Sequence, residues 1–283
     1  MAVLKVAHNI SALEAHRWLS IADASMAKSL ERLSSGYRIN RAADDAAGLA
    51  ISSRLRAQIR SLQQAQRNTE QAISMIQVAE GTLNEIHNIL ERLKELATEA
   101  ASDTVGDSDR EHIDSEAEAL LAEIDRISEA TKYADTQLIW SSLVTTWGNA
   151  TIATIQVGYR NESYDQIAIT FKAISTATLD LDGIDLSSLE NAQQALNSID
   201  AAIQSVAAAR AELGAYQNRL QYTASNLAVS VENYIASDST IRDTDMAMEM
   251  INFTKYQILV QTSMAMLAHA NALPQNILAL IGR

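Results

Sequence analysis

Residues 76–100 read IQVAEGTLNEIHNILERLKELATEA, and this stretch decides the fold. Apolar residues recur in it at every seventh position, with a second set three positions after each member of the first. Such a repeat is typical of helices that pack along a narrow seam. Traced backward, the pattern reaches the acidic pair at 44–45, and forward it ends near Asp103. The sequence therefore predicts a helix over residues 44–103, about 90 Å long at 1.5 Å per residue.

Three further segments carry helical periodicity. A turn over 104–109 precedes a second helix at 109–130, which should form a hairpin with the first. A third long helix is predicted over 186–235, where the seven-residue spacing is complete at Ile199, Val206, Leu213, Leu220 and Leu227. The last segment repeats the spacing at Leu259, Met266, Leu273 and Leu280.

The region 138–178 has a different pattern. Thr, Ile, Val and Tyr alternate in Thr151–Val157 and again in Asp165–Phe171, with a polar stretch containing Gly158 between the two runs. Period-two alternation on either side of a turn predicts a small β-hairpin.

The predicted fold is mainly α: an elongated antiparallel coiled-coil or helical-bundle rod with a small β-hairpin element and paired N- and C-terminal helices. We expect a terminal helical domain at 1–43 and 236–283, which includes a spoke-like linker after Ser34, and a rod domain at 44–235. Beyond this pairing the terminal helices are short of partners within one chain, so their apolar stripes need cover from neighbouring copies.

Composition narrows the function classes. Hydrophobic residues make up 47% of the 283-residue chain, but aromatic residues only 5%, which suits narrow helix seams. One proline permits long helices, and the absence of cysteine excludes disulfides and thiolate metal sites. The N-terminal stretch lacks the apolar region of a cleavable signal peptide, and no apolar run is long enough for a membrane span, so we expect no membrane insertion.

Charge is distributed unevenly along the chain. Residues 1–67 contain ten Lys or Arg and five Asp or Glu, whereas the whole chain carries a net charge of −13. The cations are dispersed through apolar-periodic sequence without interleaved aromatic residues, which favours contacts between copies over nucleic-acid binding.

Catalytic and metal-binding patterns are absent from the sequence. The histidines are scattered without metal-ligand spacing, at His8, His16, His87, His112 and His269. No phosphate-binding glycine loop and no nucleophile motif is present. We expect no enzyme activity, no cofactor and no metal.

Three blocks of sequence resemble bacterial flagellins. The first runs from ERLSSG at 31–36 through RIN at 38–40 to DDAAG at 44–48. The second is ISMIQ at 73–77 with EGTLNEI at 80–86, and the third joins LGAYQNR at 213–219 with AHANALPQNIL at 268–278. The resemblance covers roughly 1–135 and 185–283, and it indicates a short flagellin without large outer domains.

The resemblance implies a structural subunit that polymerises into the helical flagellar filament used for motility. Its expected partners are further copies of itself, the flagellar cap and hook-associated proteins, an export chaperone and the vertebrate Toll-like receptor for flagellin. Its expected location is extracellular, after export through the flagellum's own type III system. The alternatives are a hook-filament junction protein of the same superfamily and a soluble coiled-coil adaptor.

Two sets of site residues follow. The expected assembly interface on the terminal helices comprises Val3, Val6, Ile10, Leu13, Leu30, Leu33, Leu259, Met266, Leu273, Ile277 and Leu280. The family's receptor-contact patch maps onto Arg92, Leu96 and Glu116, with two charged contacts around an apolar one.

Overall fold

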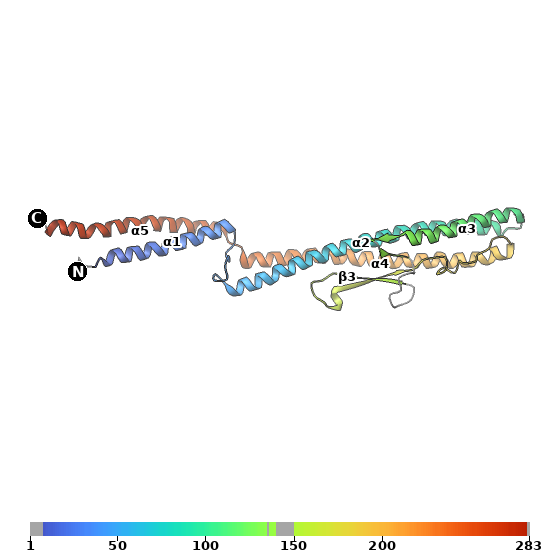
Figure 1. Ribbon diagram of the computed structural model, residues 1–283, viewed down its shortest axis with the longest axis horizontal. Coiled ribbons are helices and arrows are strands. Elements are labelled where there is room, and N and C mark those ends of the chain that lie inside the picture. Colours follow the sequence, from blue (N-terminus) through green and yellow to red (C-terminus); the bar gives the residue numbers. More distant parts are fainter. Residues whose placement is uncertain (1–7, 135, 140–149, 282–283) are drawn as a thin grey trace. The chain divides into compact units, whose positions relative to one another are not determined.

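The computed structural model describes residues 8–134, 136–139 and 150–281. Its long helices, drawn in Figure 1, are α1 (Ile10–Ser35), α2 (Ala46–Ala100), α3 (Asp107–Ala130), α4 (Leu189–Arg242) and α5 (Met246–Ile281). The strands are β1 (Lys132–Tyr133), β2 (Thr136–Gln137), β3 (Ala150–Gln156) and β4 (Gln166–Lys172), and a 3-10 turn, η1 (Ser163–Asp165), precedes β4. The prediction of a mainly helical fold with paired terminal helices and a small β-hairpin is confirmed.

The chain divides into two compact units. The terminal unit consists of Met1–Ala57 with Asn233–Arg283, and the central unit is Gln58–Glu232. The predicted domain boundaries lie at 43/44 and 235/236, and the assignment of these parts to filament core and rod stays a prediction.

In the terminal unit, α1 and α5 lie side by side (Figure 1). The side chain of Asn9 caps α1 by accepting the Ala12 N–H at 3.1 Å. At the other end Gly36 has a φ of 73°, a conformation that suits a residue without Cβ, and its N–H donates to the Arg32 carbonyl at 2.8 Å. Asp245 caps α5 by accepting the N–H groups of Ala247 and Met248.

A joint, formed by 36–45 and 243–245, connects the helices of this unit. The Arg38 N–H donates to the Arg242 carbonyl at 2.7 Å, and the Thr244 N–H donates to the Gly36 carbonyl at 3.0 Å. The side chain of Asp45 accepts the Gly48 N–H at 2.8 Å. Asp45 is therefore the N-cap, and α2 begins at Ala46, two residues after the predicted start.

The seven-residue repeat of apolar residues, from which the long helices were predicted, is buried in the central unit. The heptad positions of α2 are buried at Ile76, Ala79, Leu83, Ile86, Leu90, Leu93, Ala97 and Ala100, and those of α4 at Ile199, Val206, Leu213, Leu220 and Leu227. Most of these side chains belong to one apolar core, shared with α3 and β4. The seven-residue spacing thus marks the seam between helices of one chain.

Buried polar contacts close the hairpin of α2 and α3. The Nε–H of Arg110 donates to the Ala100 carbonyl at 2.9 Å, and an Nη2–H donates to the Ser102 carbonyl at 2.9 Å. Arg110 lies near the start of α3 and is 6% exposed, with its guanidinium against carbonyls at the end of α2 and in the turn that follows. Its guanidinium supplies donors to carbonyls left without helical partners at the end of α2.

The segment between β4 and α4 is tied to α3. The Asp125 carboxylate accepts the backbone N–H of Thr176 at 2.9 Å and its hydroxyl at 2.7 Å. Asp114 accepts the Leu186 N–H at 2.8 Å, and the Ser128 hydroxyl donates to the Ile174 carbonyl. These contacts position a connection that lacks regular structure of its own.

The predicted β-hairpin is present as β3 and β4, within one residue of its expected bounds. The strands are antiparallel, and Ile155 pairs with Ile167. Alternate residues of β4 face the core, with Ile167, Ile169 and Phe171 all buried. The two-residue strands β1 and β2, also antiparallel, were not predicted because such short pairs carry no periodic signal.

Helix boundaries differ from prediction by a few residues, and α3 begins at Asp107 instead of 109 and α4 at Leu189 instead of 186. The helix α4 continues to Arg242 instead of 235, and α2 ends at Ala100 instead of 103. The apolar seam of α4 has its last buried member at Leu227, but backbone hydrogen bonds continue without it, for example from Asp243 N–H to the Ser239 carbonyl. An apolar period therefore locates the buried part of a helix, and the helix itself can run further.

Candidate assembly surface

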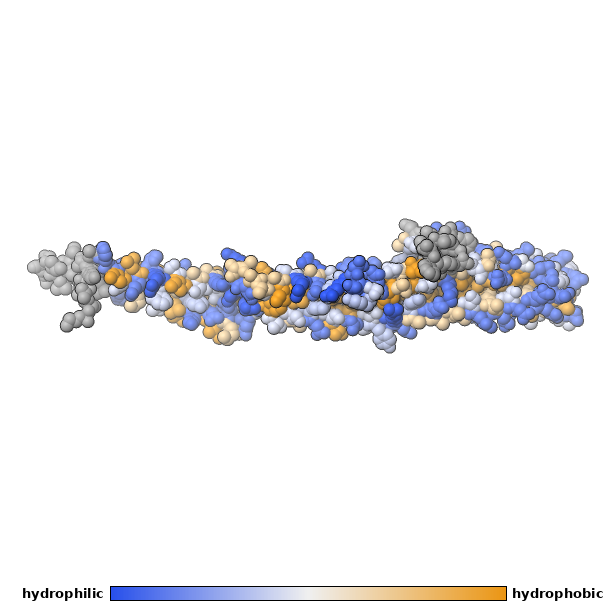
Figure 2. Space-filling view, turned by 90° about the horizontal axis from the view of Figure 1, so that it is seen from below, coloured by the Kyte–Doolittle hydropathy of each residue, from blue (hydrophilic) through white to orange (hydrophobic). Residues whose placement is uncertain are grey.

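The terminal helices expose an apolar surface. We define this terminal apolar surface by their exposed large side chains, which are Ile10, Leu13, Trp18, Ile21 and Leu30 of α1, and Met246, Met248, Met250, Ile251, Ile258, Leu259, Met264 and Met266 of α5. Leu13 is 69% exposed and Ile251 is 63% exposed. Figure 2 shows apolar residues interspersed with hydrophilic ones along one face of these helices. Isolated exposed apolar residues are common, but a concentration of this kind marks an interaction surface.

The helix α5 is apolar on several faces. Glu249 and Ala270 are buried, whereas Ile251 and Ile258 are more than half exposed. At 3.6 residues per turn, these isoleucines lie roughly opposite the face that carries Glu249 and Ala270. A helix that is apolar all round is normally a buried helix, and pairing with α1 covers only one side.

Few polar contacts hold α1 against α5. The Asn9 side-chain amide donates to the Ala270 carbonyl at 2.8 Å, and Arg32 lies 3.6 Å from the Glu249 carboxylate. Within α1 only Ala22 and Ser29 are buried. The pair is aligned by these contacts, but it buries little apolar area within one chain.

The predicted interface residues fall into three groups. Ile10, Leu13, Leu30, Leu259 and Met266 are exposed on the terminal apolar surface, and Leu33 is half-buried. Val3 and Val6 lie outside the described residues, as do the side chains of Leu273, Ile277 and Leu280.

Sequence reasoning missed much of this surface. Trp18, Ile21, Ile251 and Ile258 are exposed and were not predicted as interface residues. The prediction followed one residue in seven along α5, which selects a single stripe. Apolar residues on several faces of α5, rather than on one, are the signal that finds Ile251 and Ile258.

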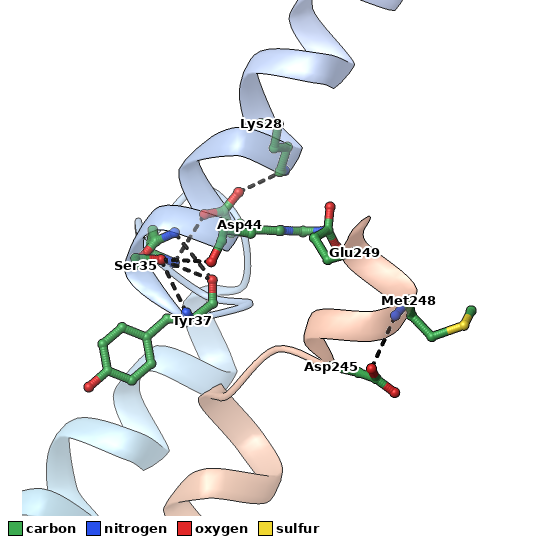
Figure 3. A network of polar contacts seen from close by, with 9 residues as sticks. Lys28, Ser35, Tyr37, Asp44, Asp245, Met248 and Glu249 are labelled. Atoms are coloured by element: carbon green, nitrogen blue, oxygen red, sulfur yellow. Dashed lines mark hydrogen bonds and ion pairs between the residues drawn. The ribbon is translucent and has the colours of Figure 1, made fainter. Parts of the chain in front are cut away.

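A polar network fixes the joint beside this surface (Figure 3). The Asp44 carboxylate lies 2.7 Å from the Lys28 ammonium and accepts the backbone N–H groups of Arg41 and Asn40. The hydrogen bond from Lys28, followed by that from Arg41, lowers the pKa of Asp44 from 3.8 to about 2. The carboxylate therefore remains ionised at neutral and mildly acidic pH.

Close packing and ring stacking also constrain the joint. The Arg242 guanidinium lies 4.3 Å from the centre of the Tyr37 ring, within cation–π distance. A Cβ on Gly48 would come within 2.5 Å of an Asp45 oxygen and 2.8 Å of the Ile39 side chain. Ile39 is 1% exposed, so it has little freedom to move aside.

The predicted receptor patch requires a correction. Arg92 and Glu116 are brought together, with nitrogen and oxygen 2.9 Å apart, and both are about half exposed. Leu96, however, is 2% exposed because it belongs to the core of the central unit. The prediction of Leu96 as an apolar surface contact is wrong, since a partner would have to open the bundle to reach it.

Among the described residues, no helix is both long and apolar enough to cross a membrane. In the same part of the chain, no group of three or more His, Asp or Glu side chains is arranged to hold a metal ion.

The fold and surface define a class of mainly helical protein whose paired terminal helices carry exposed apolar side chains. Residues 6–142 match the bacterial flagellin N-terminal helical region, and residues 196–281 match the bacterial flagellin C-terminal helical region. The chain therefore belongs to the bacterial flagellin family.

Individual relatives agree with this assignment. The chain is 43% identical to a flagellin of Halalkalibacterium halodurans, with 97% of this chain and 98% of the relative covered. It is 40% identical to a flagellar filament 31.3 kDa core protein of Treponema maltophilum, over 97% and 98% of the two chains.

A solved structure shares the fold. A flagellar hook-associated protein from Vibrio parahaemolyticus superposes with a TM-score of 0.59, covering 71% of this chain and 100% of the other. Its 15% identity supports a common fold alone. The chain is a structural subunit of the flagellar filament, as its flagellin and filament-core relatives indicate, and the hook-filament junction alternative is not favoured.

Proposed function

We propose that this subunit polymerises by placing the terminal apolar surface of one copy against neighbouring copies. The observation that carries the proposal is the exposure of apolar side chains on α1 and α5, with Leu13 at 69% and Ile251 at 63%. Water contact with so many large apolar groups is unfavourable, and identical copies offer matching surfaces. Repetition of a contact between different faces of identical subunits produces an open helical fibre.

The free energy gained by apolar burial and the free-energy cost of association support assembly that depends on protein concentration. Covering a half-exposed Leu, Ile or Met gains about 1 kcal/mol, since full burial is worth about 1.5–3 kcal/mol. The thirteen side chains of the terminal apolar surface, which are twelve Leu, Ile or Met and Trp18, give a gain on the order of 10 kcal/mol. Association costs about 4–15 kcal/mol, so gain and cost are of similar size. A measurable critical concentration for polymerisation is therefore expected.

The two units take different roles in this proposal. The terminal helices, over 1–43 and 236–283, form the filament core, and residues 44–235 form the rod. The support is that the central unit buries its heptad positions within one chain, whereas the terminal unit leaves its apolar residues exposed. In the family, the termini become ordered only on assembly, which couples folding of the ends to polymerisation.

The flagellar context suggests the remaining partners and the route to the cell exterior. The subunit is exported through the channel of the growing flagellum, is delivered by an export chaperone, and is inserted under the cap after the hook-associated proteins. Family membership supports these assignments. The same membership supports a purely structural role without catalysis.

A second binding function concerns the innate receptor. The ion pair of Arg92 and Glu116 lies on the surface of the central unit and offers both charges to a partner. Replacing Arg92 by Ala should weaken activation of the Toll-like receptor for flagellin in a reporter assay. Arg126→Ala is the matched control, because Arg126 forms a similar exposed pair with Glu123. Equal signalling by both variants would remove the receptor from the proposal.

The main test is a charge placed in the terminal apolar surface. Ile251→Asp should raise the critical concentration for polymerisation more than about tenfold, because an unpaired carboxylate buried between copies costs more than about 1.4 kcal/mol. Sedimentation and electron microscopy of the purified full-length chain measure it. Val78→Asp is the control, since Val78 is also an exposed apolar residue on a helix but lies in the central unit. Unchanged filament formation by the Ile251 variant contradicts the proposed interface.

A further inference from the structure

The methionines of this chain are concentrated in one helix. Of eight in the sequence, five lie in α5 within residues 246–266. They are Met246, Met248, Met250, Met264 and Met266. Leucine would supply a similar apolar volume, so the recurrence of a thioether at these positions suggests a property beyond hydrophobicity.

These five side chains are accessible in the single subunit. Their exposed fractions range from 47% for Met246 to 59% for Met266, whereas Met75 of the central unit is 9% exposed. In Figure 3 the Met248 side chain extends away from the polar contacts of the joint. Solvent therefore reaches the sulfur-bearing side chains of α5 far more readily than that of Met75.

The methionines also flank the seam between α1 and α5. One face of α5 carries the buried Glu249. At 3.6 residues per turn, Met246, Met250 and Met264 lie on one side of this face, and Met248 and Met266 lie on its other side. Any copy that covers the terminal apolar surface along either flank of the seam meets thioethers.

We propose that the five methionines of α5 form a site of oxidative modification by peroxides. Their oxidation to sulfoxides prevents incorporation of the subunit into the filament. The sulfur lone pair attacks one oxygen of the peroxide, and the O–O bond breaks. The departing hydroxide takes up the proton of the hydroxyl group transferred to sulfur, which gives water and leaves the oxygen on sulfur. Each sulfur is oxidised by two electrons to a sulfoxide, and one peroxide is reduced. The product is a polar sulfoxide in place of an apolar thioether.

The consequence rests on the proposed assembly through the terminal apolar surface. A sulfoxide buried between copies is an acceptor without a donor, so the oxidised surface associates less well. Burial in the filament in turn protects the thioethers. The free subunit is thus the vulnerable species, and an oxidised one is excluded from the polymer until it is reduced.

The experiment compares purified full-length chain before and after treatment with hydrogen peroxide. Peptide mass spectrometry should find sulfoxide at the five α5 positions before it appears at Met75. The critical concentration should rise about tenfold or more, equivalent to about 1.4 kcal/mol. Treatment with methionine sulfoxide reductases should restore it, which separates this effect from irreversible damage. Helical content, followed by circular dichroism, should stay unchanged.

Two variants locate the effect. Replacing all five α5 methionines by Leu should leave polymerisation intact and insensitive to peroxide, whereas Met26→Leu with Met75→Leu should remain sensitive. The inference is overturned if oxidised protein polymerises at the original concentration, if peroxide inhibits the five-fold variant equally, or if reductase treatment restores nothing. Failure of the untreated chain to form filaments overturns the proposed function instead, so the two proposals fail at different steps.

Discussion

In the central unit, side chains such as Ile86 of α2 and Ile199 of α4 have no exposed area. In the terminal unit, the seven-residue spacing of α5 leads instead to side chains such as Leu259 and Met266, which are 41% and 59% exposed. The same seven-residue spacing therefore leads to buried side chains in the central unit and to exposed side chains in the terminal unit. In the central unit the partner helices belong to the same chain, whereas in the terminal unit the described residues supply no second layer of partners.

This difference separates two sources of stability. The central unit gains its apolar burial on folding, at about 25 cal/mol per Å², and depends on no other copy. The terminal unit leaves its large apolar side chains exposed, so under the proposed assembly its ordering is coupled to association. Substitutions that affect folding and those that affect polymerisation should therefore map to different units.

The largest expected effect lies in the core of the central unit. Leu90 has no exposed area, and Leu90→Ala should lower the free energy of unfolding by about 2–5 kcal/mol, because it removes buried methyl groups and leaves a cavity. Urea denaturation followed by circular dichroism measures the change. Leu13→Ala is the matched control, because Leu13 is 69% exposed; it should change the stability of the monomer by less than about 0.5 kcal/mol and should weaken polymerisation. Equal destabilisation by both substitutions would contradict the contrast between the units.

A smaller loss is expected at the turn between α2 and α3. Arg110→Ala should lower the free energy of unfolding by about 3 kcal/mol, because the buried carbonyl of Ala100 and the part-buried carbonyl of Ser102 lose a charged donor. Hydrogen exchange at the end of α2 should accelerate as well. Arg110→Lys should fall between wild type and Ala, since Lys cannot present a planar fork. The ion pair to Asp107 should matter little, because that carboxylate is 90% exposed and Asp107→Asn should change stability only slightly.

Two glycines of α2 provide a finer comparison. Gly48→Ala should destabilise the joint by about 1–2 kcal/mol, because the new Cβ meets Asp45 and the buried Ile39. Gly81→Ala should stabilise the central unit by about 0.5–1 kcal/mol, since a Cβ there meets nothing within 4 Å and alanine favours a helix. Thermal unfolding of the two variants should shift in opposite directions. A shift of the same sign for both would show that helix propensity alone governs these sites.

The smallest effect concerns the pH dependence of the joint. The hydrogen bond from Lys28 lowers the pKa of Asp44 to about 2, so its contribution to stability is complete above the usual value of 3.8 and is lost as the pH falls through about 2. Lys28→Met should raise this pKa towards 3.8, as carboxyl NMR titration would detect. The effect on stability should be slight, because Lys28 is about half exposed and water screens the pair. An unchanged Asp44 titration in the Lys28 variant would assign the low pKa to the backbone donors of Arg41 and Asn40.

Sequence pattern predicted the long helices because apolar periodicity reports the buried face directly. It misplaced the end of α4 because the helix outlasts its seam, and it missed β1 and β2 because two-residue strands have no period. Leu96 illustrates a different failure. A match of residue type to a known contact carries no information on whether the side chain faces the solvent, and here it faces the core.

The helical class, the seams of α2 and α4, and membership of the flagellin family could all be predicted from residue order, because heptad spacing and family motifs are patterns along the chain. Which of those apolar residues find partners within the chain became clear from the folded arrangement. It also placed Asp44 beside Lys28 and Arg242 against Tyr37. The physical reason is that burial depends on what packs against a face, and residues far apart in the chain decide that.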